Sequence, residues 1–365
     1  MPASPRPISN RELNRAVLAR QSLLKRERRA PLDIVRLLGG IQAQNGNASY
    51  VSLWNRIEGF RVADLEALFE SRAVVRANVQ RGTIHLLTAE DYLAWQPLLL
   101  PTLKRMAKGN FGRFLTGVDF ADIAGEAKKL LTREPLTNAD LGRALQKRWP
   151  DRDRLALAIV GRSLNPTIHQ PPSGLWNKGA APRFVLAKSW LGRNPKAGRA
   201  DDMVLRYLAA FGPASVMDAQ MWSGVPRLAP VFERLRKKLV TFTAESGREL
   251  FDLPDAPRPG ADTPAPHRLL ADYENLGLGY ADRTRFGSDL SLTGLAPDPR
   301  YFVAAMTADG VFVGFWRLDA RAKEPEIALR PTPGIRKADL RALKAEGERL
   351  LSGLCAGKGR ITVIS

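Results

Sequence analysis

Residues 239–253 read Leu-Val-Thr-Phe-Thr-Ala-Glu-Ser-Gly-Arg-Glu-Leu-Phe-Asp-Leu, two short alternating stretches on either side of a turn that contains Gly247. This alternation around a glycine turn predicts a β-hairpin. Helical patterns come immediately before it, over 201–211, after a cap at Ser215, and over 227–238. Three short helices followed by a two-stranded ribbon predict a winged helix-turn-helix unit.

The same order occurs twice more, closer to the N-terminus. Strand patterns at 74–79 and 83–87 follow several helical segments, and a second series of helices (119–132, 138–147, 154–164) leads to a strand pattern at 167–170. Repetition at a spacing of about a hundred residues indicates an array of domains. We therefore expect an α+β protein with three tandem winged-helix units, over residues 1–115, 116–198 and 199–256.

The last part of the chain, residues 257–365, has a different pattern. A proline-rich stretch at 255–266 predicts a linker or surface loop. Beyond it, strands at 301–306 and 311–318 are joined by Asp309-Gly310, a strong hairpin turn. A helix at 336–354 and a strand at 360–364 follow. These elements predict a small, β-rich and barrel-like C-terminal domain.

Residues 38–47 contain two glutamines in an unusual setting. The stretch Leu-Gly-Gly-Ile-Gln-Ala-Gln-Asn-Gly-Asn places Gln42 and Gln44 between a glycine pair and an Asn-Gly-Asn turn, and helical patterns flank it on both sides. Side chains at i and i+2 of an extended backbone point the same way. Both amides could then contact the same small group, which suggests a site. The alternative is that they cap a helix end.

The charge of the chain suggests its partner. The formal net charge is +19, and residues 154–199 hold eight Lys or Arg and no Asp or Glu. Such a surface attracts polyanions, of which duplex DNA is the densest common one. A merely basic protein and an acidic membrane surface are the alternatives. With one cysteine, no export signal and no apolar run of about 18 residues, we expect a cytoplasmic, nucleoid-associated monomer and no membrane contact.

The usual catalytic signatures are missing from the sequence. There is no His-Glu-x-x-His, P-loop or Gly-x-Ser-x-Gly motif. His85, His169 and His267 lack metal-ligand spacing, and no cluster of carboxylates suggests a two-metal site. We expect no metal and no cofactor. On architecture alone, a non-catalytic winged-helix DNA-binding transcriptional regulator stays open beside an enzyme.

Several segments resemble the AlkZ-type bacterial DNA glycosylases, the AlkZ/YcaQ group of tandem winged-helix proteins. The resemblance extends over nearly the whole chain. The segments that carry it are Leu38–Gln44, Arg81–Leu86, Ser173–Trp176, Gly212–Ser215, Trp222–Gly224 and Tyr280–Arg285. The resemblance implies a C-shaped array with a β-rich C-terminal domain and a positive channel for DNA. It also implies hydrolysis of the N-glycosidic bond of bulky N7-alkylguanines, including interstrand cross-links made by genotoxic natural products. The other branch carries Asp at the position of Gln44, so this chain is similar to the self-resistance branch.

The chemistry is consistent with a pair of neutral amides. Alkylation at N7 makes guanine cationic, so the base leaves as a neutral molecule and needs no acid. A glutamine oxygen can accept a hydrogen bond from the attacking water, and positioning alone can remove much of a barrier. We assign Gln44 to the water and Gln42 to its orientation or to the sugar, and expect selectivity for cationic adducts over undamaged bases or uracil. Base flipping stays open.

Further residues are candidates for binding damaged double-stranded DNA. The candidates for phosphate contacts, each of which is otherwise an ordinary surface charge, are Arg76, Arg81, Arg154, Arg162, Lys178, Arg227, Arg234, Arg283 and Arg285. The candidates for lining the channel are Asn45, Tyr50, Tyr273 and Asn275, whereas Trp54 is expected in the core. The turn at Asp309-Gly310 and the wing at 245–247 are both candidates for a hairpin that enters a groove.

Overall fold

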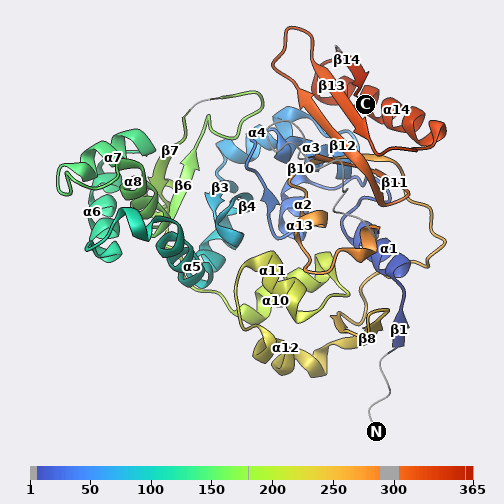
Figure 1. Cartoon of the computed structure of the whole chain (residues 1–365), viewed down its shortest axis with the longest axis horizontal. Coiled ribbons are helices and arrows are strands. Elements are labelled where there is room, and N and C mark those ends of the chain that lie inside the picture. The colour runs from blue at the N-terminus through green and yellow to red at the C-terminus, as the bar shows by residue number, and fades with distance from the viewer. Residues whose placement is uncertain (1–5, 180, 288–303, 358, 365) are drawn as a thin grey trace.

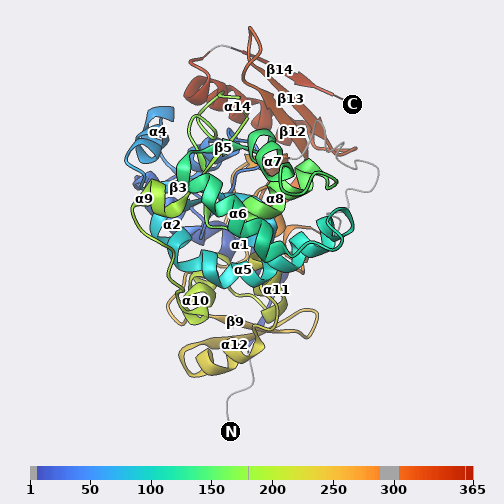
Figure 2. The same cartoon turned by 90° about the vertical axis from the view of Figure 1, so that its left-hand side faces the viewer.

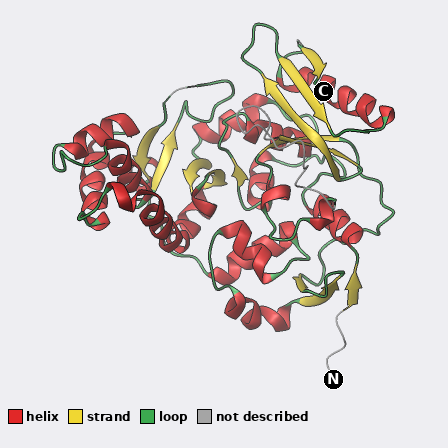
Figure 3. Ribbon diagram, viewed as in Figure 1, coloured by secondary structure: helices red, strands yellow, loops and turns green. Residues whose placement is uncertain are grey.

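The computed structural model describes residues 6–179, 181–287, 304–357 and 359–364. Within these ranges the protein is a mixed α+β structure with three three-stranded sheets and one five-stranded sheet. Figure 1 shows the N-terminal region at the centre, residues 120–191 in green to the left, residues 200–252 in yellow below, and the C-terminal sheet in orange and red above. Figure 3 shows the same view by secondary structure.

The N-terminal region carries the glutamine segment on a short strand. Its elements are β1 (Arg6–Ile8), α1 (Asn10–Arg20), α2 (Pro31–Leu37), β2 (Ile41–Gln42), α3 (Ala48–Arg56), α4 (Val62–Glu70), β3 (Val74–Asn78), β4 (Ile84–Thr88) and α5 (Ala89–Phe111). Strand β4 lies between β2 and β3 and is antiparallel to both. Helix α1 begins at the expected Ser9 cap. It ends at Arg20, well before the expected end at Arg28, and Ser22 just beyond it has a positive φ of 54°.

The middle regions repeat this order. The second has α6 (Phe120–Arg133), β5 (Leu136–Thr137), α7 (Asn138–Gln146), α8 (Arg154–Ser163), β6 (Thr167–Gln170), β7 (Arg183–Leu186) and α9 (Ala187–Leu191). The third has α10 (Ala200–Phe211), α11 (Val216–Ser223), α12 (Ala229–Leu235), β8 (Val240–Ala244) and β9 (Glu249–Asp252).

In each region a short strand or bridge near the start pairs with the last strand of that region's sheet. Strand β2 pairs with β4, β5 pairs with β7, and Ala214 forms an isolated bridge with Phe251 on β9. Helices followed by a two-stranded ribbon are present in all three regions, with β3–β4, β6–β7 and β8–β9 as the ribbons. The short first strands and β7 were not expected from the sequence. Strand β1 adds to the third region, parallel to β8.

The C-terminal region is an open sheet covered by a helix. Its elements are β10 (Arg268–Asp272), α13 (Asn275–Leu278), β11 (Ala304–Ala308), β12 (Val311–Asp319), β13 (Glu326–Pro331), α14 (Lys337–Leu354) and β14 (Arg360–Val363). The strand order is sequential from β10 to β14. Among the described residues β10 and β14 are edges, so the barrel-like expectation is corrected to an open sheet. The side view in Figure 2 places this sheet at the opposite end from α12.

The expected C-terminal hairpin is present where the structure describes it. Asp309 and Gly310 have φ values of 49° and 76°, which fits the tight turn between β11 and β12. The expected strand 301–306 begins outside the described residues, at 301–303. Short 3-10 turns complete the described elements at Gln80–Gly82, Gly112–Phe114, Arg236–Lys238 and Thr284–Phe286.

The regions share cores around the glutamine segment. Trp222 of the third region is buried and meets Trp95 of α5 edge to face at 5.8 Å between ring centroids. A second cluster joins α3 to the C-terminal sheet, through residues such as Trp54, Leu269 and Trp316. The second region has a separate core around Leu157. Helices from distant parts of the sequence thus hold residues 39–47 between them.

Candidate functional site

The glycine pair sets the direction of the glutamine segment. Gly39 and Gly40 have φ values of 62° and 108°, which L side chains rarely adopt. A Cβ on Gly39 would also lie 2.9 Å from Cζ2 of Trp222. The chain therefore turns directly against the third region and enters β2. Pairing continues past β2, since the Ala43 amide donates to the Ile84 carbonyl at 2.7 Å.

Gln42 is held by an arginine that also contacts the third region. Its side chain is buried, and its Oε1 accepts a hydrogen bond from Nη2 of Arg81 at 2.8 Å. The same guanidinium donates from Nη1 to the carbonyl of Trp222. Burial, with a smaller effect from Arg283, lowers the pKa of Arg81 to about 10, so it stays charged at neutral pH. Gln42 is thus fixed beside a positive charge.

Gln44 is the exposed member of the pair. Its Oε1 accepts from the Ile84 amide in a long contact of 3.4 Å, and its backbone carbonyl accepts from Nη2 of Arg76 at 3.3 Å. The backbone at Gln44 is therefore fixed while its side chain meets solvent. Gln42 is buried and Gln44 is exposed, so the pair is not shut off from solvent.

Arg76 is buried and its donors are used within the protein. It donates to the Ala43 carbonyl at 3.0 Å and to Oγ of Ser173 at 2.7 Å, and it lies 3.3 Å from Nδ1 of His169. Burial lowers its pKa to about 10. Arg76 therefore joins the glutamine segment to the second region, and its guanidinium is not available for a phosphate contact.

Arg162 and Arg285 are buried in the same manner. Arg162 donates to Oδ1 of Asn78 and of Asn138, both at 2.8 Å, which ties α8 to strand β3. Arg285 donates to the Pro213 carbonyl at 3.1 Å. Neither guanidinium presents its charge to the surface, so the expectation that Arg162 and Arg285 contact phosphate is corrected.

The remaining basic candidates are accessible. Those that are exposed are Arg154, Lys178, Arg227 and Arg234. Arg234 is paired with Asp201 at 2.5 Å, which offsets part of its charge. Arg283 is half-buried and close enough to Arg81 to lower that residue's pKa.

The four candidates for the channel fall in different environments. Tyr50 is fully buried and its hydroxyl accepts from the Trp176 amide at 3.1 Å, so it packs in the core. Asn275 is buried and its Nδ2 donates to the Gly40 carbonyl at 2.8 Å. Tyr273 is half-buried with a φ of 55°, and Asn45 is exposed. Of these four residues, only Asn45 and Tyr273 are accessible to solvent.

Asp272 lies against the candidate site, and sequence reasoning did not select it. Its Oδ2 accepts from Nδ2 of Asn45 at 2.8 Å. A single carboxylate at the end of a strand carries no spacing that would mark it. Its position just before Tyr273 and Asn275, both selected as channel residues, was the available signal.

The Ser173–Trp176 segment of the second region packs against the turn that follows the glutamines. A Cβ on Gly46 would lie 3.2 Å from Cα of Gly174. Asn47 donates to Oδ1 of Asn177 at 2.7 Å and accepts from its amide at 2.9 Å. Segments from three regions thus converge on residues 39–47.

The described residues hold no group of three or more His, Cys, Asp and Glu that could bind a metal ion. Burial lowers the pKa of His85 to about 3, with a further effect of Arg81, so this imidazole is neutral beside Gln42. The described helices include none long and apolar enough to cross a membrane.

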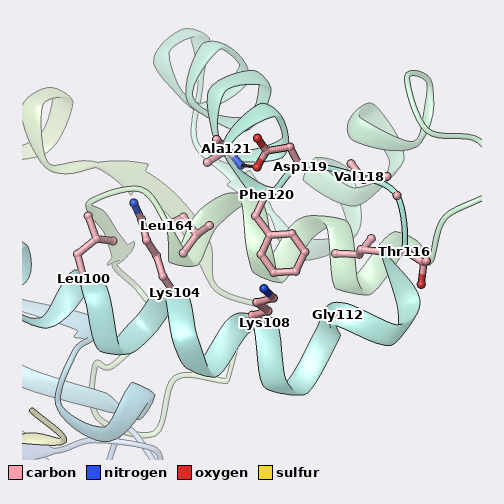
Figure 4. A pocket seen from close by; sticks show the side chains of 13 residues that line it. Leu100, Lys104, Lys108, Gly112, Thr116, Val118, Asp119, Phe120, Ala121 and Leu164 are labelled. Carbon is pink, nitrogen blue, oxygen red and sulfur yellow. Dashed lines mark hydrogen bonds between the residues drawn. The ribbon is translucent and has the colours of Figure 1, made fainter. Parts of the chain in front are cut away.

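A cavity of about 650 Å³ lies elsewhere, between the end of α5 and the start of α6. Figure 4 shows Lys104 and Lys108 beside it, with Phe120 on the opposite wall. None of the residues around the glutamines line it. The cavity is therefore separate from the site described above.

Comparison with known proteins identifies the family. A family model described as DNA glycosylase AlkZ-like matches residues 35–352. The fold is similar to that of the solved Streptomyces sahachiroi DNA glycosylase AlkZ, with a TM-score of 0.75 and 19% identity over 98% of this chain and 100% of that chain. No curated protein matches. Because the family model covers most of its length, the chain belongs to the AlkZ-like DNA glycosylase family.

Proposed function

We propose that the protein is a monofunctional, metal-independent DNA glycosylase for bulky cationic N7-alkylguanines, including interstrand cross-links, and that it provides self-resistance to a genotoxic natural product. Membership of a DNA glycosylase family supports the reaction class. The observation that carries the finer proposal is the exposed Gln44 amide beside the fixed Gln42. We interpret the three repeated regions as winged-helix units, arranged as a C around the DNA.

The leaving group explains why amides suffice. An N7-alkylated guanine is already positively charged, so breaking its glycosidic bond produces a neutral base and needs no proton donor. The enzyme must position water below C1′ and tolerate a cationic sugar. Gln44 reaches solvent and can bind that water through its amide. Gln42 is held by Arg81 through its oxygen, which leaves its NH2 group to orient the water or contact the sugar.

Five basic residues supply the proposed DNA contacts. Arg154, Lys178 and Arg227 are exposed, whereas Arg81 and Arg283 are half-buried and add positive charge beside the glutamines. Phosphate contacts of this kind fix register without reading sequence. We also propose that the protein binds DNA as a monomer and without a cofactor.

The test is base release from a duplex that carries one N7-alkylguanine. The parent protein is expected to release the adducted base and leave an alkali-labile abasic site. Gln44→Ala is expected to lower the single-turnover rate by about 10²-fold or more, the loss that follows when a reactant is misplaced. Gln146→Ala, a glutamine of α7 outside the site, is the control and retains activity. Binding without any abasic product would favour a non-catalytic regulator.

A further inference from the structure

Residues 272–275 lie along the glutamine segment and are fastened to it at both ends. At one end, Asn45 donates to Oδ2 of Asp272 at 2.8 Å. At the other, Asn275 donates to the carbonyl of Gly40 at 2.8 Å. The residues between Gly40 and Asn45 include both glutamines. Asp272 is therefore at the Gln44 end of the segment.

Asp272 is a carboxylate without a basic partner among the described residues. No described Lys, Arg or His lies within ion-pair distance of it, in a chain with 56 Lys and Arg. Glu274, two residues along, is by contrast paired with Arg56 at 3.1 Å. No described residue donates to Oδ1 of Asp272. A half-buried carboxylate that no described cation neutralises is costly, and such groups cluster at functional sites.

The proposed reaction needs a group of this type. Neither glutamine can accept a proton at neutral pH, yet hydrolysis releases one from the attacking water. The Arg81 guanidinium, 2.8 Å from Gln42 Oε1, also disfavours a cationic sugar nearby. A carboxylate on the same segment would accept the proton and offset the positive charge.

We propose that Asp272 is the general base of the glycosylase reaction, an inference that rests on the proposed function. The water oxygen forms a bond to C1′ while the C1′–N9 bond breaks. The bonding electrons pass to the guanine ring and neutralise its charge. The proton of the water passes to the Asp272 carboxylate, and the hydroxyl stays on C1′. Gln44 binds the water, and Asn45 holds the carboxylate through its hydrogen bond to Oδ2.

The environment of Asp272 is suited to this role. Burial raises the pKa of its carboxyl group, and the hydrogen bond from Asn45 opposes that shift only in part. A raised pKa makes the carboxylate a better proton acceptor. A surface aspartate would lack this property.

The variant Asp272→Asn separates catalysis from structure. Its amide oxygen still accepts the hydrogen bond from Asn45, but the charge and the basicity are gone. We expect the single-turnover rate on N7-alkylguanine duplex to fall by about 10²–10⁴-fold, the range for general bases, with the duplex Kd and the melting temperature unchanged. Asp255→Asn, an exposed aspartate of the 255–266 loop, is the control and retains the parent rate.

A purely structural role predicts a different pattern. If Asp272 only holds Asn45 in place, Asp272→Asn will release the base at a rate within about twofold of the parent rate, whereas Asp272→Ala will be slower. That result would overturn the inference. Failure of the proposed function gives another pattern, in which the parent protein releases no base. If the parent is active, Gln44→Ala is inactive and Asp272→Asn is fully active, the general-base role of Asp272 is rejected and the proposed glycosylase function stands.

Discussion

Nη2 of Arg81 lies 2.8 Å from Oε1 of Gln42, and Nη1 of the same side chain donates to the Trp222 carbonyl. One guanidinium therefore connects the first glutamine to the third region of the chain. Arg81 itself has a positive φ of 53° in the turn between β3 and β4. The position of Gln42 thus depends on a hairpin and on a helix more than a hundred residues away.

Removing this link should reduce catalysis more than binding. We expect Arg81→Ala to lower the single-turnover rate by about 10–100-fold, since misplaced catalytic groups cost that much or more. The Kd for duplex is expected to rise only by the amount of one lost phosphate contact. Rates measured at saturating enzyme separate the two effects. An equal change in both would show that Arg81 contributes only its charge.

Arg76 is predicted to act on stability. Arg76→Ala leaves the carbonyl of Ala43 and Oγ of Ser173 without their buried donor, which we expect to destabilise the fold by about 2–4 kcal/mol. Urea unfolding checks this value, and Arg154→Ala, an exposed arginine, serves as the control with a change within about 0.5 kcal/mol. Unchanged stability of Arg76→Ala would contradict the structural role assigned to it.

Duplex affinity should fall steeply as salt increases. Several phosphate contacts predict a loss of orders of magnitude between about 50 and 200 mM salt. Arg227→Ala should reduce the slope of log K against log salt by about 0.9. Arg234→Ala should change it less, because Asp201 already pairs with Arg234 at 2.5 Å. Identical slopes for the parent and Arg227→Ala would remove Arg227 from the interface.

Glu346 of α14 predicts an acid-dependent stability. It is fully buried, with Arg26 at 2.8 Å and Arg268 at 3.2 Å. Burial alone would raise the pKa of its carboxyl group, but these arginines and Arg349 lower it below the ordinary value. The stabilisation is therefore present above the pKa of the unfolded state and is lost as pH falls through the lower pKa of the folded state.

The matching variant is Glu346→Gln. It should destabilise the protein by about 3–5 kcal/mol near neutral pH, since one partner of a buried ion pair is removed. The difference from the parent should shrink as the pH is lowered. Glu348→Gln, on the exposed side of the same helix, is the control. A difference that does not depend on pH would contradict the assignment.

The sequence predicted local elements well because their signals are local. The Ser9 and Ser215 caps, the Asp309-Gly310 turn and the ribbons at 74–87 and 240–252 all depend on neighbouring residues. The end of α1 was predicted too late, because apolar spacing continues past Ser22 while the backbone turns. Short strands such as β2 and β5 form only by pairing with distant partners.

The surroundings of the glutamines were harder to predict. Arg76, Arg162 and Arg285 have the charge expected for phosphate contacts, but long-range packing buries them. Asp272 reaches the site only because β10 ends beside Asn45, more than two hundred residues away in sequence. Burial and pairing between distant segments are set by the tertiary fold, so residue type alone could not separate these cases.

The most direct test of the account measures base release from two matched duplexes, one with a single N7-alkylguanine and one undamaged. We predict release from the alkylated duplex only, with a single-turnover rate that Gln44→Ala lowers by about 10²-fold or more while duplex binding is retained. Release of no base by the parent protein, or equal rates for the parent, Gln42→Ala and Gln44→Ala, would contradict the central claim that these amides carry the reaction.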